Sequence, residues 1–172
     1  MPGPVFIRGE RVTLRPQQAT DSDLLQRLLN EPQVRHNIGF SEPLSGPAAE
    51  DLDSRDGDTQ FIVCVDDEPV GTCILHEDYH PWGFAVLGYS MCPDYWGNGY
   101  ATDTVDCLAQ YAFQELRLNK LDAHCYVTDP ASARVLEKVG FQQEGRRRDH
   151  AFVNGEYVDL LEYGHLADEW NP

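Results

Sequence analysis

An apolar segment followed by a glycine-containing loop and a long helix constrains the fold of this chain more than any other feature. Residues Phe84 to Met91 are almost continuously apolar, which predicts a central strand covered on both faces. After Pro93 and the loop, residues 100–116 place apolar side chains three and four positions apart, as in a one-sided helix. Residues 121–127 alternate between apolar and polar as a second strand. This order forms a right-handed crossover, so the sequence predicts a parallel pair of strands.

Further strands and helices are expected on both sides of this unit. The strands are expected at residues 10–15, 61–65, 70–75, from 141 onward, 148–153 and 156–165, and the helices at 20–31, 48–52 and 130–139. Thr20 is expected to cap the first of these helices, and Gly140 to end the last one in the left-handed conformation. Asn154 and Gly155 are typical of a tight hairpin turn. Within residues 33–58, the part outside the short helix expected at 48–52 is expected to be loop. The elements indicate a single domain, residues 1–172, of the α/β (α+β mixed) class.

The charge of the chain limits the partners that it can have. It carries 29 acidic and 13 basic residues, for a net charge of −16, so a nucleic-acid partner is not expected. The acidic residues are dispersed and lysine is nearly absent, which resembles proteins from a salt-loaded cytoplasm; an acidic protein from an ordinary cytoplasm is the alternative. The chain has no apolar run of membrane-spanning length and no signal-peptide pattern, so we expect a cytoplasmic protein with no membrane partner.

The five cysteines indicate neither a disulfide framework nor a metal site. They are odd in number, widely spaced and mostly placed inside apolar segments. This placement predicts buried thiols in a reducing compartment. No metal is expected.

The loop between the central strand and its helix has the properties of an anion site. It runs Tyr95-Trp96-Gly97-Asn98-Gly99-Tyr100-Ala101-Thr102. Unpaired backbone N–H groups converge at the positive end of the helix dipole, and the two glycines let a phosphate approach the backbone closely. A plainer explanation is that the glycines only permit a tight turn.

The surrounding sequence resembles the GNAT superfamily of N-acetyltransferases. The segment from Gly88 to Asp103 resembles the acyl-CoA pyrophosphate loop of this family, and residues 131–141, ASARVLEKVGF, resemble its fourth-helix motif. Together with residues 154–159, NGEYVD, they resemble the RimJ/RimL branch of ribosomal-protein N-acetyltransferases. The resemblance implies a mixed, mostly antiparallel sheet of six to seven strands with a central splayed parallel pair, flanked by about four helices. It implies acetyl transfer from acetyl-CoA to a primary amine, either a protein N-terminus or a small molecule, by direct attack in a ternary complex.

The resemblance also implies which residues bind coenzyme A. The backbone amides of Trp96, Gly97, Asn98, Gly99, Tyr100, Ala101 and Thr102 would hold the pyrophosphate. Met91 and Cys92 would lie along the pantetheine, and the free backbone edge of Met91 would orient the acetyl carbonyl. Two positions depart from the family pattern. Asp94 replaces a residue that usually donates to phosphate, so its side chain is expected to face away, and Asp129 replaces an asparagine, so its contact with the pantetheine is in doubt.

The catalytic groups are less well defined by the sequence. Ser132 matches the serine whose hydroxyl is placed to protonate the coenzyme A thiolate in the ribosomal-protein enzymes; alternatively, Ser132 or Asp129 only caps a helix. Both positions that carry a glutamate base in this branch hold other residues, Val86 and Ala151. The remaining base candidates are His150, Glu77 and His76, with His150 preferred, or a water relayed from backbone carbonyls.

Three alternatives remain open at this point. A catalytically silent acyl-CoA-binding sensor of the same fold would explain the missing carboxylates. The basic run Arg146-Arg147-Arg148 could meet the adenosine 3′-phosphate, although pairing with nearby acids is the more ordinary role of such a run. The protein could be a monomer or a homodimer.

Overall fold

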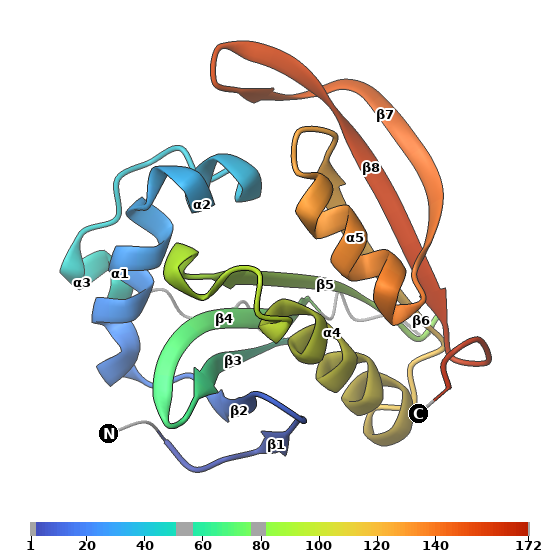
Figure 1. Cartoon of the computed structure of the whole chain (residues 1–172), viewed down its shortest axis with the longest axis horizontal. Helices are drawn as coiled ribbons and strands as arrows, with labels where there is room; N and C mark the ends of the chain where they lie inside the picture. Colours follow the sequence, from blue (N-terminus) through green and yellow to red (C-terminus); the bar gives the residue numbers. More distant parts are fainter. Residues whose placement is uncertain (1–2, 51–56, 77–81, 172) are drawn as a thin grey trace.

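One sheet organises the molecule. The computed structural model describes residues 3–50, 57–76 and 82–171. In this part of the chain the sheet has eight strands, in the order β1-β2-β3-β4-β5-β6-β8-β7 (Figure 1). The strands are β1 (Ile7–Arg8), β2 (Thr13–Pro16), β3 (Asp58–Val65), β4 (Glu68–His76), β5 (Phe84–Met91), β6 (Lys120–Tyr126), β7 (Gln142–Val153) and β8 (Glu156–Leu166). Only the β5–β6 pairing is parallel among these neighbours. The mixed, mostly antiparallel sheet is therefore confirmed, with one more strand than expected because two residues, Ile7 and Arg8, pair at its edge.

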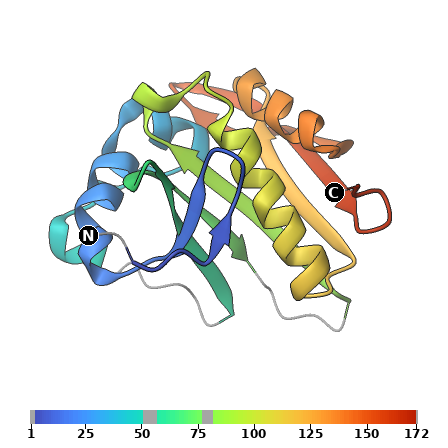
Figure 2. The ribbon, with the colours of Figure 1, turned by 60° about the horizontal axis from the view of Figure 1, so that its bottom comes forward.

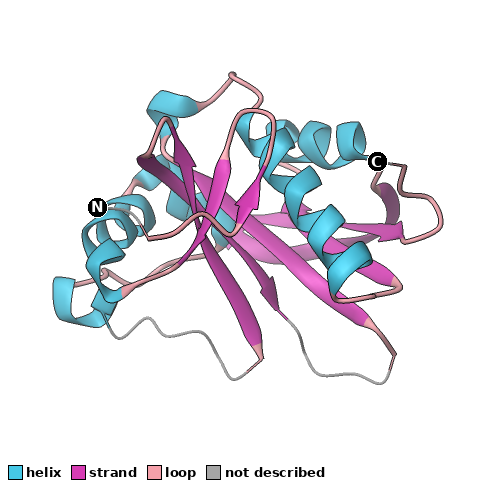
Figure 3. Cartoon of the chain, turned by 90° about the horizontal axis from the view of Figure 1, so that it is seen from below, coloured by secondary structure: helices cyan, strands magenta, loops and turns pink. Residues whose placement is uncertain are grey.

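Helices cover both faces of this sheet (Figure 3). They are α1 (Ser22–Asn30), α2 (Pro32–Ile38), α3 (Gly46–Glu50), α4 (Tyr100–Gln110) and α5 (Pro130–Val139). Strand β3 needs helices on both faces of the sheet, because its side chains alternate between two hydrophobic cores. Phe61 and Val63 join the main core with α4 and α5, whereas Ile62 and Cys64 join a second core with the leucines of α1.

The first helices differ from the prediction at their ends. The buried residues of α1 are Leu24, Leu25, Leu28 and Leu29, but Thr20 does not cap the helix. Instead Thr20 lies inside a 3₁₀ turn, Ala19–Asp21, in which the Asp21 carboxylate accepts a hydrogen bond from the Gln18 N–H (2.8 Å). This extra turn moves the start of α1 to Ser22.

Residues 33–58 also contain more helix than predicted. Pro32 does not merely end α1 but occupies the first turn of α2, where a proline loses no helical hydrogen bond. The side chain of Glu31 accepts a hydrogen bond from the Gln33 N–H and so caps α2. The short helix expected at 48–52 lies at Gly46–Glu50, and the rest of that predicted range falls outside the described residues.

The C-terminal half follows the predicted order closely. Helix α4 ends at Gln110 and continues as a π-helical turn, Tyr111–Glu115. Gly140 ends α5 with a φ of 108°, as predicted for a left-handed residue. Asn154 and Gly155 form the predicted hairpin turn, with φ values of 51° and 89°. The long hairpin of β7 and β8 extends past α5 (Figure 1).

A single carboxylate anchors the start of α4 to the N-terminal hairpin. Asp103, in the first turn of α4, accepts hydrogen bonds from the backbone N–H groups of Glu10 (3.2 Å), Arg11 (2.7 Å) and Val12 (2.9 Å). In Figure 2 this hairpin and α5 lie on either side of α4. The contact fixes both the position of the helix and the path of the loop that precedes it.

We predict that Asp103→Ala lowers the free energy of unfolding by about 2–3 kcal/mol, because three backbone donors lose a charged acceptor. Urea unfolding measures this change. Asp106→Ala is the matched control, since Asp106 is an exposed acid in the same helix, and it should change the free energy by less than about 0.5 kcal/mol. Equal effects of the two substitutions would contradict the anchoring role.

Candidate functional site

The parallel strands separate halfway along their length. Their pairing begins at Phe84 and Lys120 and ends at Leu87 and Ala123. Beyond this point β5 continues beside β4, whereas β6 continues beside β8. A cavity of about 590 Å³ lies where the two strands diverge. This is the splayed parallel pair that the resemblance to the GNAT superfamily implies.

The cavity reaches both faces of the sheet. On the face of α4 and α5 it is lined by the loop after β5, the first residues of α4, and Ser132, Val135 and Lys138 of α5. On the opposite face it is lined by Gln33, Val34, Asn37 and Ile38 of α2 and by His124 and Tyr126 of β6. The alternation of β6 explains the division, because its odd-numbered residues are buried in the α4–α5 core and the even-numbered ones point away from it. Two molecules can therefore meet in the gap from opposite faces.

The glycine loop is held in one shape by its own contacts. Gly97 and Gly99 have φ values of 77° and 81°, which favour glycine, and Gly99 is the N-cap of α4. The Trp96 indole N–H donates to the Met91 carbonyl (2.9 Å), and the Asn98 amide donates to the carbonyls of Tyr95 and Trp96. The loop therefore presents a helix N-terminus to the cavity in a preorganised form, as an anion site requires.

Most of the residues predicted to bind the cofactor lie on the cavity wall. They are Met91, Trp96, Gly97, Gly99, Tyr100, Ala101, Thr102, Asp129 and Ser132. Asn98 does not line the cavity but braces the loop, and Cys92 is buried in the second core. Asp94 lines a different cavity, of about 300 Å³, together with Arg27 and Glu68, so its carboxylate stands away from the loop's anion site.

Positive charge near the loop comes from arginine and lysine side chains rather than from the loop itself. The Arg11 guanidinium donates to the Asn98 carbonyl (3.0 Å), and Arg134 and Lys138 line the cavity from α5. In a chain of net charge −16, these cations and the backbone amides offset the surrounding acidity. The site suits an anion that approaches between α4 and α5.

The backbone of Met91 faces the gap. The next residue, Cys92, donates its N–H to the Val70 carbonyl on the β4 side. Because successive residues of a strand direct their backbone groups to opposite edges, the Met91 N–H and carbonyl point toward the gap. Its carbonyl already accepts from Trp96, so the Met91 N–H is the group suited to orient a bound carbonyl oxygen.

The sequence left open whether Ser132 or Asp129 caps the helix that begins at Pro130, and the structure shows that Asp129 does. The Asp129 carboxylate caps α5 by accepting from the Ser132 N–H (3.1 Å). The Ser132 hydroxyl lies on the cavity wall, with its Oγ 2.8 Å from the Tyr89 hydroxyl. Helix capping uses the Ser132 N–H and not its hydroxyl, so the hydroxyl remains available on the cavity wall.

Tyr89 is a functional candidate that sequence reasoning missed. Burial raises the pKa of this phenol well above its ordinary value. The Ser132 hydrogen bond lowers the pKa in part, and the Asp129 charge raises it by a smaller amount. Tyr89 therefore stays protonated and can donate to Ser132 Oγ, which leaves the serine proton available to the cavity. Strand alternation places Tyr89 on the same face as the buried residues Ala85 and Leu87, but the sequence does not show which helix covers that face.

The predicted base candidates do not meet at the cavity. His76 pairs with Asp58 (2.9 Å) beside the opposite end of β5, and Glu77 falls outside the described residues. His150 is exposed in an irregular part of β7 and is absent from the described cavity wall. His124, which the sequence analysis did not select, does line the cavity.

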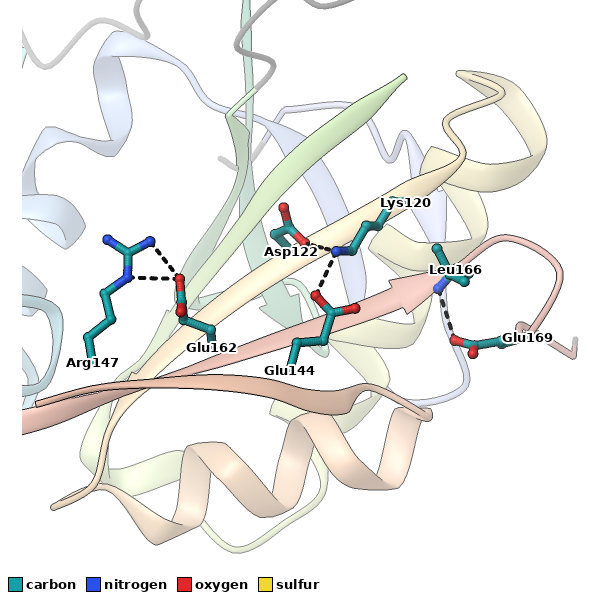
Figure 4. Close-up of polar contacts among 7 residues, drawn as sticks. All are labelled: Lys120, Asp122, Glu144, Arg147, Glu162, Leu166 and Glu169. Carbon is teal, nitrogen blue, oxygen red and sulfur yellow. Dashed lines mark hydrogen bonds and ion pairs between the residues drawn. The ribbon is translucent and has the colours of Figure 1, made fainter. Parts of the chain in front are cut away.

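The basic run on β7 is engaged by acids of β8. Arg146 pairs with Asp159, and Arg147 binds Glu162 through Nε (2.8 Å) and Nη2 (2.6 Å; Figure 4). Of the three arginines, these two therefore follow the more ordinary alternative, a face of paired charges. The pKa values of Asp159 and Glu162 are both lowered, by backbone and arginine hydrogen bonds for Asp159 and chiefly by Arg147 for Glu162.

Comparison with known proteins agrees with this architecture. Residues 11–142 match the acetyltransferase (GNAT) domain family. The chain is 30% identical over 173 residues to the putative ribosomal N-acetyltransferase YdaF of Bacillus subtilis, covering 94% of each protein. It is 31% identical over 158 residues to a spermidine N(1)-acetyltransferase of Vibrio cholerae, covering 88% of this chain and 91% of the relative. A crystal structure of the V. cholerae spermidine N-acetyltransferase in complex with CoA and spermine matches with a TM-score of 0.85 at 25% identity, over 92% of this chain and 97% of that one.

Two features are absent from the described residues. None of the helices there is both long and apolar enough to cross a bilayer. The same part of the chain holds no group of three or more His, Cys, Asp or Glu side chains arranged to bind a metal ion.

Charge at the glycine loop provides a direct test of the anion site. We predict that Gly99→Asp weakens acetyl-CoA binding about 10-fold or more, because a carboxylate would stand beside the phosphates. Gly99→Asn is the matched control, since asparagine has nearly the same shape and tolerates the same left-handed backbone without the charge. Calorimetric titration of both variants measures the difference. Equal affinities for acetyl-CoA would mean that the phosphates lie elsewhere.

The Ser132 hydroxyl is tested by its effect on turnover. We predict that Ser132→Ala lowers kcat about 10- to 100-fold while acetyl-CoA affinity changes little, because a general acid acts in the transition state. Tyr89→Phe should give a smaller loss in the same direction, since it removes only the donor behind the serine. Steady-state kinetics and a binding titration make the comparison. A Ser132→Ala enzyme with unchanged kcat would assign the hydroxyl a structural role.

Proposed function

This chain belongs to the GNAT family of acetyltransferases, and from that premise we propose that its acceptor is the terminal amine of a polypeptide. Membership makes it an acetyl-CoA-dependent N-acetyltransferase that acts on amines. The proposal adds an acceptor of the kind used by the RimJ/RimL branch. It is supported by the wall of the cavity on the α2 face.

The observation that carries the proposed reaction is the cavity that passes through the sheet. Acetyl-CoA would lie between α4 and α5, with its phosphates at the Gly99 N-cap and its thioester at the gap. The amine would approach from the α2 face. Its neutral nitrogen attacks the carbonyl carbon, the C–S bond breaks, and the departing thiolate takes a proton from Ser132. The proton that the nitrogen loses as the amide forms restores the serine hydroxyl. Direct transfer of this kind requires no covalent nucleophile.

The acceptor wall favours a molecule with one reactive amine over a polyamine. Its α2 residues, Gln33 and Asn37, carry no charge. Glu162, beyond the wall, is already paired with Arg147. A second ammonium group would therefore find no unpaired carboxylate on the described part of this wall, whereas a peptide could use the amide side chains and the exposed Ile38. The 30% identity with YdaF, a putative ribosomal N-acetyltransferase, agrees with a polypeptide acceptor.

A polyamine acceptor is the second candidate. It is favoured by the 31% identity with a spermidine N(1)-acetyltransferase and by the solved neighbour that holds CoA and spermine. The two candidates differ in the charge that the acceptor site must balance. A polyamine needs carboxylates along its length, and a peptide N-terminus needs one proton acceptor.

A thiol-release assay with a panel of amines tests the proposed function. We expect peptides with free N-termini to be acetylated with a kcat/KM about 10-fold or more above that of spermidine, because one ammonium is desolvated instead of several. N-terminally blocked peptides are the control and should release no thiol. The assay is run in dilute buffer and in molar KCl, since the acidic composition predicts adaptation to salt. A preference for spermidine would support the second candidate, and acetyl-CoA binding without turnover of any amine would contradict an enzymatic role.

A further inference from the structure

The two residues that follow the last parallel pair face each other across the opening. Leu87 pairs with Ala123, and the next residues along the two strands are Gly88 and His124. Gly88 has no side chain, and a Cβ there would meet only Ile74 of β4 within 4 Å (3.1 Å). The gap therefore stays open beside Gly88, and an exposed imidazole stands on the other side of it.

Several other polar groups on the described cavity wall are less suited to accept the proton of the amine. Burial raises the pKa of Tyr126, so its phenol stays protonated. The Cys125 thiol, whose pKa burial raises to about 11, belongs to the main core. Asp129 caps α5, and Lys138 is a cation. An imidazole, in contrast, can accept a proton near neutral pH.

Charged side chains lie beside His124 on the neighbouring strands β8 and β7. Glu162 on β8 is the register partner of His124, so the two side chains share one face of the sheet. Arg147 on β7 holds the Glu162 carboxylate with two hydrogen bonds (2.8 and 2.6 Å), as Figure 4 shows. These hydrogen bonds lower the pKa of Glu162, so the carboxylate stays ionised. His150 also contributes to the lowering and so lies close to the same carboxylate.

Two further acids on this face, Asp122 and Glu144, are paired with a lysine side chain. Lys120 binds both Asp122 (3.2 Å) and Glu144 (2.6 Å), which Figure 4 shows beside the Arg147–Glu162 pair. On α2, which closes the cavity from above this face, the lining residues Gln33 and Asn37 are uncharged. The ionised group paired in register with His124 is therefore Glu162.

We propose that His124 is the general base of the acetyl transfer and that Glu162, fixed by Arg147, is its positioning residue. The inference rests on the proposed function, because it requires an amine that approaches from the α2 face. The His124 imidazole takes the proton of the acceptor ammonium, and the freed nitrogen lone pair attacks the acetyl carbonyl. The carbon–sulfur bond then breaks, and the thiolate is protonated from Ser132. The attacking nitrogen loses a second proton as the amide forms, and this proton restores the Ser132 hydroxyl. The proton held by His124 then leaves to solvent, which regenerates the free base.

The test compares pH profiles of kcat/KM for the wild type and for His124→Gln. Glutamine is similar to histidine in length and polarity, but its amide cannot accept the proton of the acceptor ammonium. We expect a loss of about 100-fold at neutral pH and disappearance of the acidic limb of the profile, because general base catalysis contributes at least that much. Acetyl-CoA affinity, measured by calorimetry, should stay unchanged. If His124→Gln does not fold, His124→Asn serves for the same comparison.

Glu162→Gln tests the positioning role with a readout that a purely structural effect would not produce. Removing the negative charge disfavours the imidazolium, so the acidic limb should move to lower pH, by about half a unit. Glu144→Gln is the matched control, since Glu144 lies on the same face but pairs with Lys120, and its profile should match the wild type. An unmoved limb in Glu162→Gln would remove the positioning role.

Three results would overturn the proposal. His124→Gln could retain activity within about 3-fold together with its acidic limb, which would leave the function intact and exclude His124 as the base. Loss of the acidic limb in His150→Gln with its retention in His124→Gln would transfer the role to His150. Absence of turnover by the wild type with every amine would remove the proposed function and this inference together.

Discussion

The opening of one parallel ladder is the constraint on which the rest of the structure depends. Hydrogen bonding between β5 and β6 stops after Leu87 and Ala123, and each strand continues with its antiparallel neighbour instead. A sheet whose strands stayed paired would leave no room for a cavity at its centre. The divergence creates that room without exposing the core, because α4, α5 and α2 close it from both faces. Donor and acceptor can then meet at the middle of the sheet.

The donor side of this gap relies on backbone groups, and the surrounding contacts explain why they stay in place. Gly99 begins α4, Asp103 ties that helix to the N-terminal hairpin, and Arg11 from the same hairpin holds the Asn98 carbonyl. The loop is thus braced from outside by the chain's first strands. An acidic protein can bind a polyanion in this way, since amide groups and a helix terminus carry no countercharge that the acidic surface could neutralise.

The sequence predicted those parts of the fold and site that depend on local pattern. The apolar run at Phe84–Met91, the glycine loop and the hairpin turn at Asn154 each signal their structure within a few residues, and the structure places them as expected. Helix α2 was missed because Pro32 ends one helix and begins another, and the first-turn position of a proline cannot be told from a terminator by sequence alone.

The candidate catalytic groups were harder to predict because they depend on which strand edge opens. His124 and Tyr89 lie at ordinary strand positions, and only the point where the ladder separates puts them beside the gap. Among the three base candidates chosen from sequence, His150 was preferred because it adjoins Ala151, a position that carries a glutamate base in some related enzymes. The strand register places neither histidine candidate at the opening, because His76 lies beside the closed end of β5 and His150 lies in a bulged segment of β7.

Amide hydrogen exchange in a dead-end complex tests most directly whether two ligands meet in this gap from opposite faces. Exchange is measured for the free protein, with CoA, and with CoA plus an acceptor peptide. The account predicts that CoA slows exchange at residues 91–102 and 131–138, and that the peptide then adds protection at 32–38 and 123–127 without displacing it. Protection by the peptide on the α4–α5 side, or loss of the CoA protection when the peptide binds, would contradict a cavity that joins the two faces of the sheet.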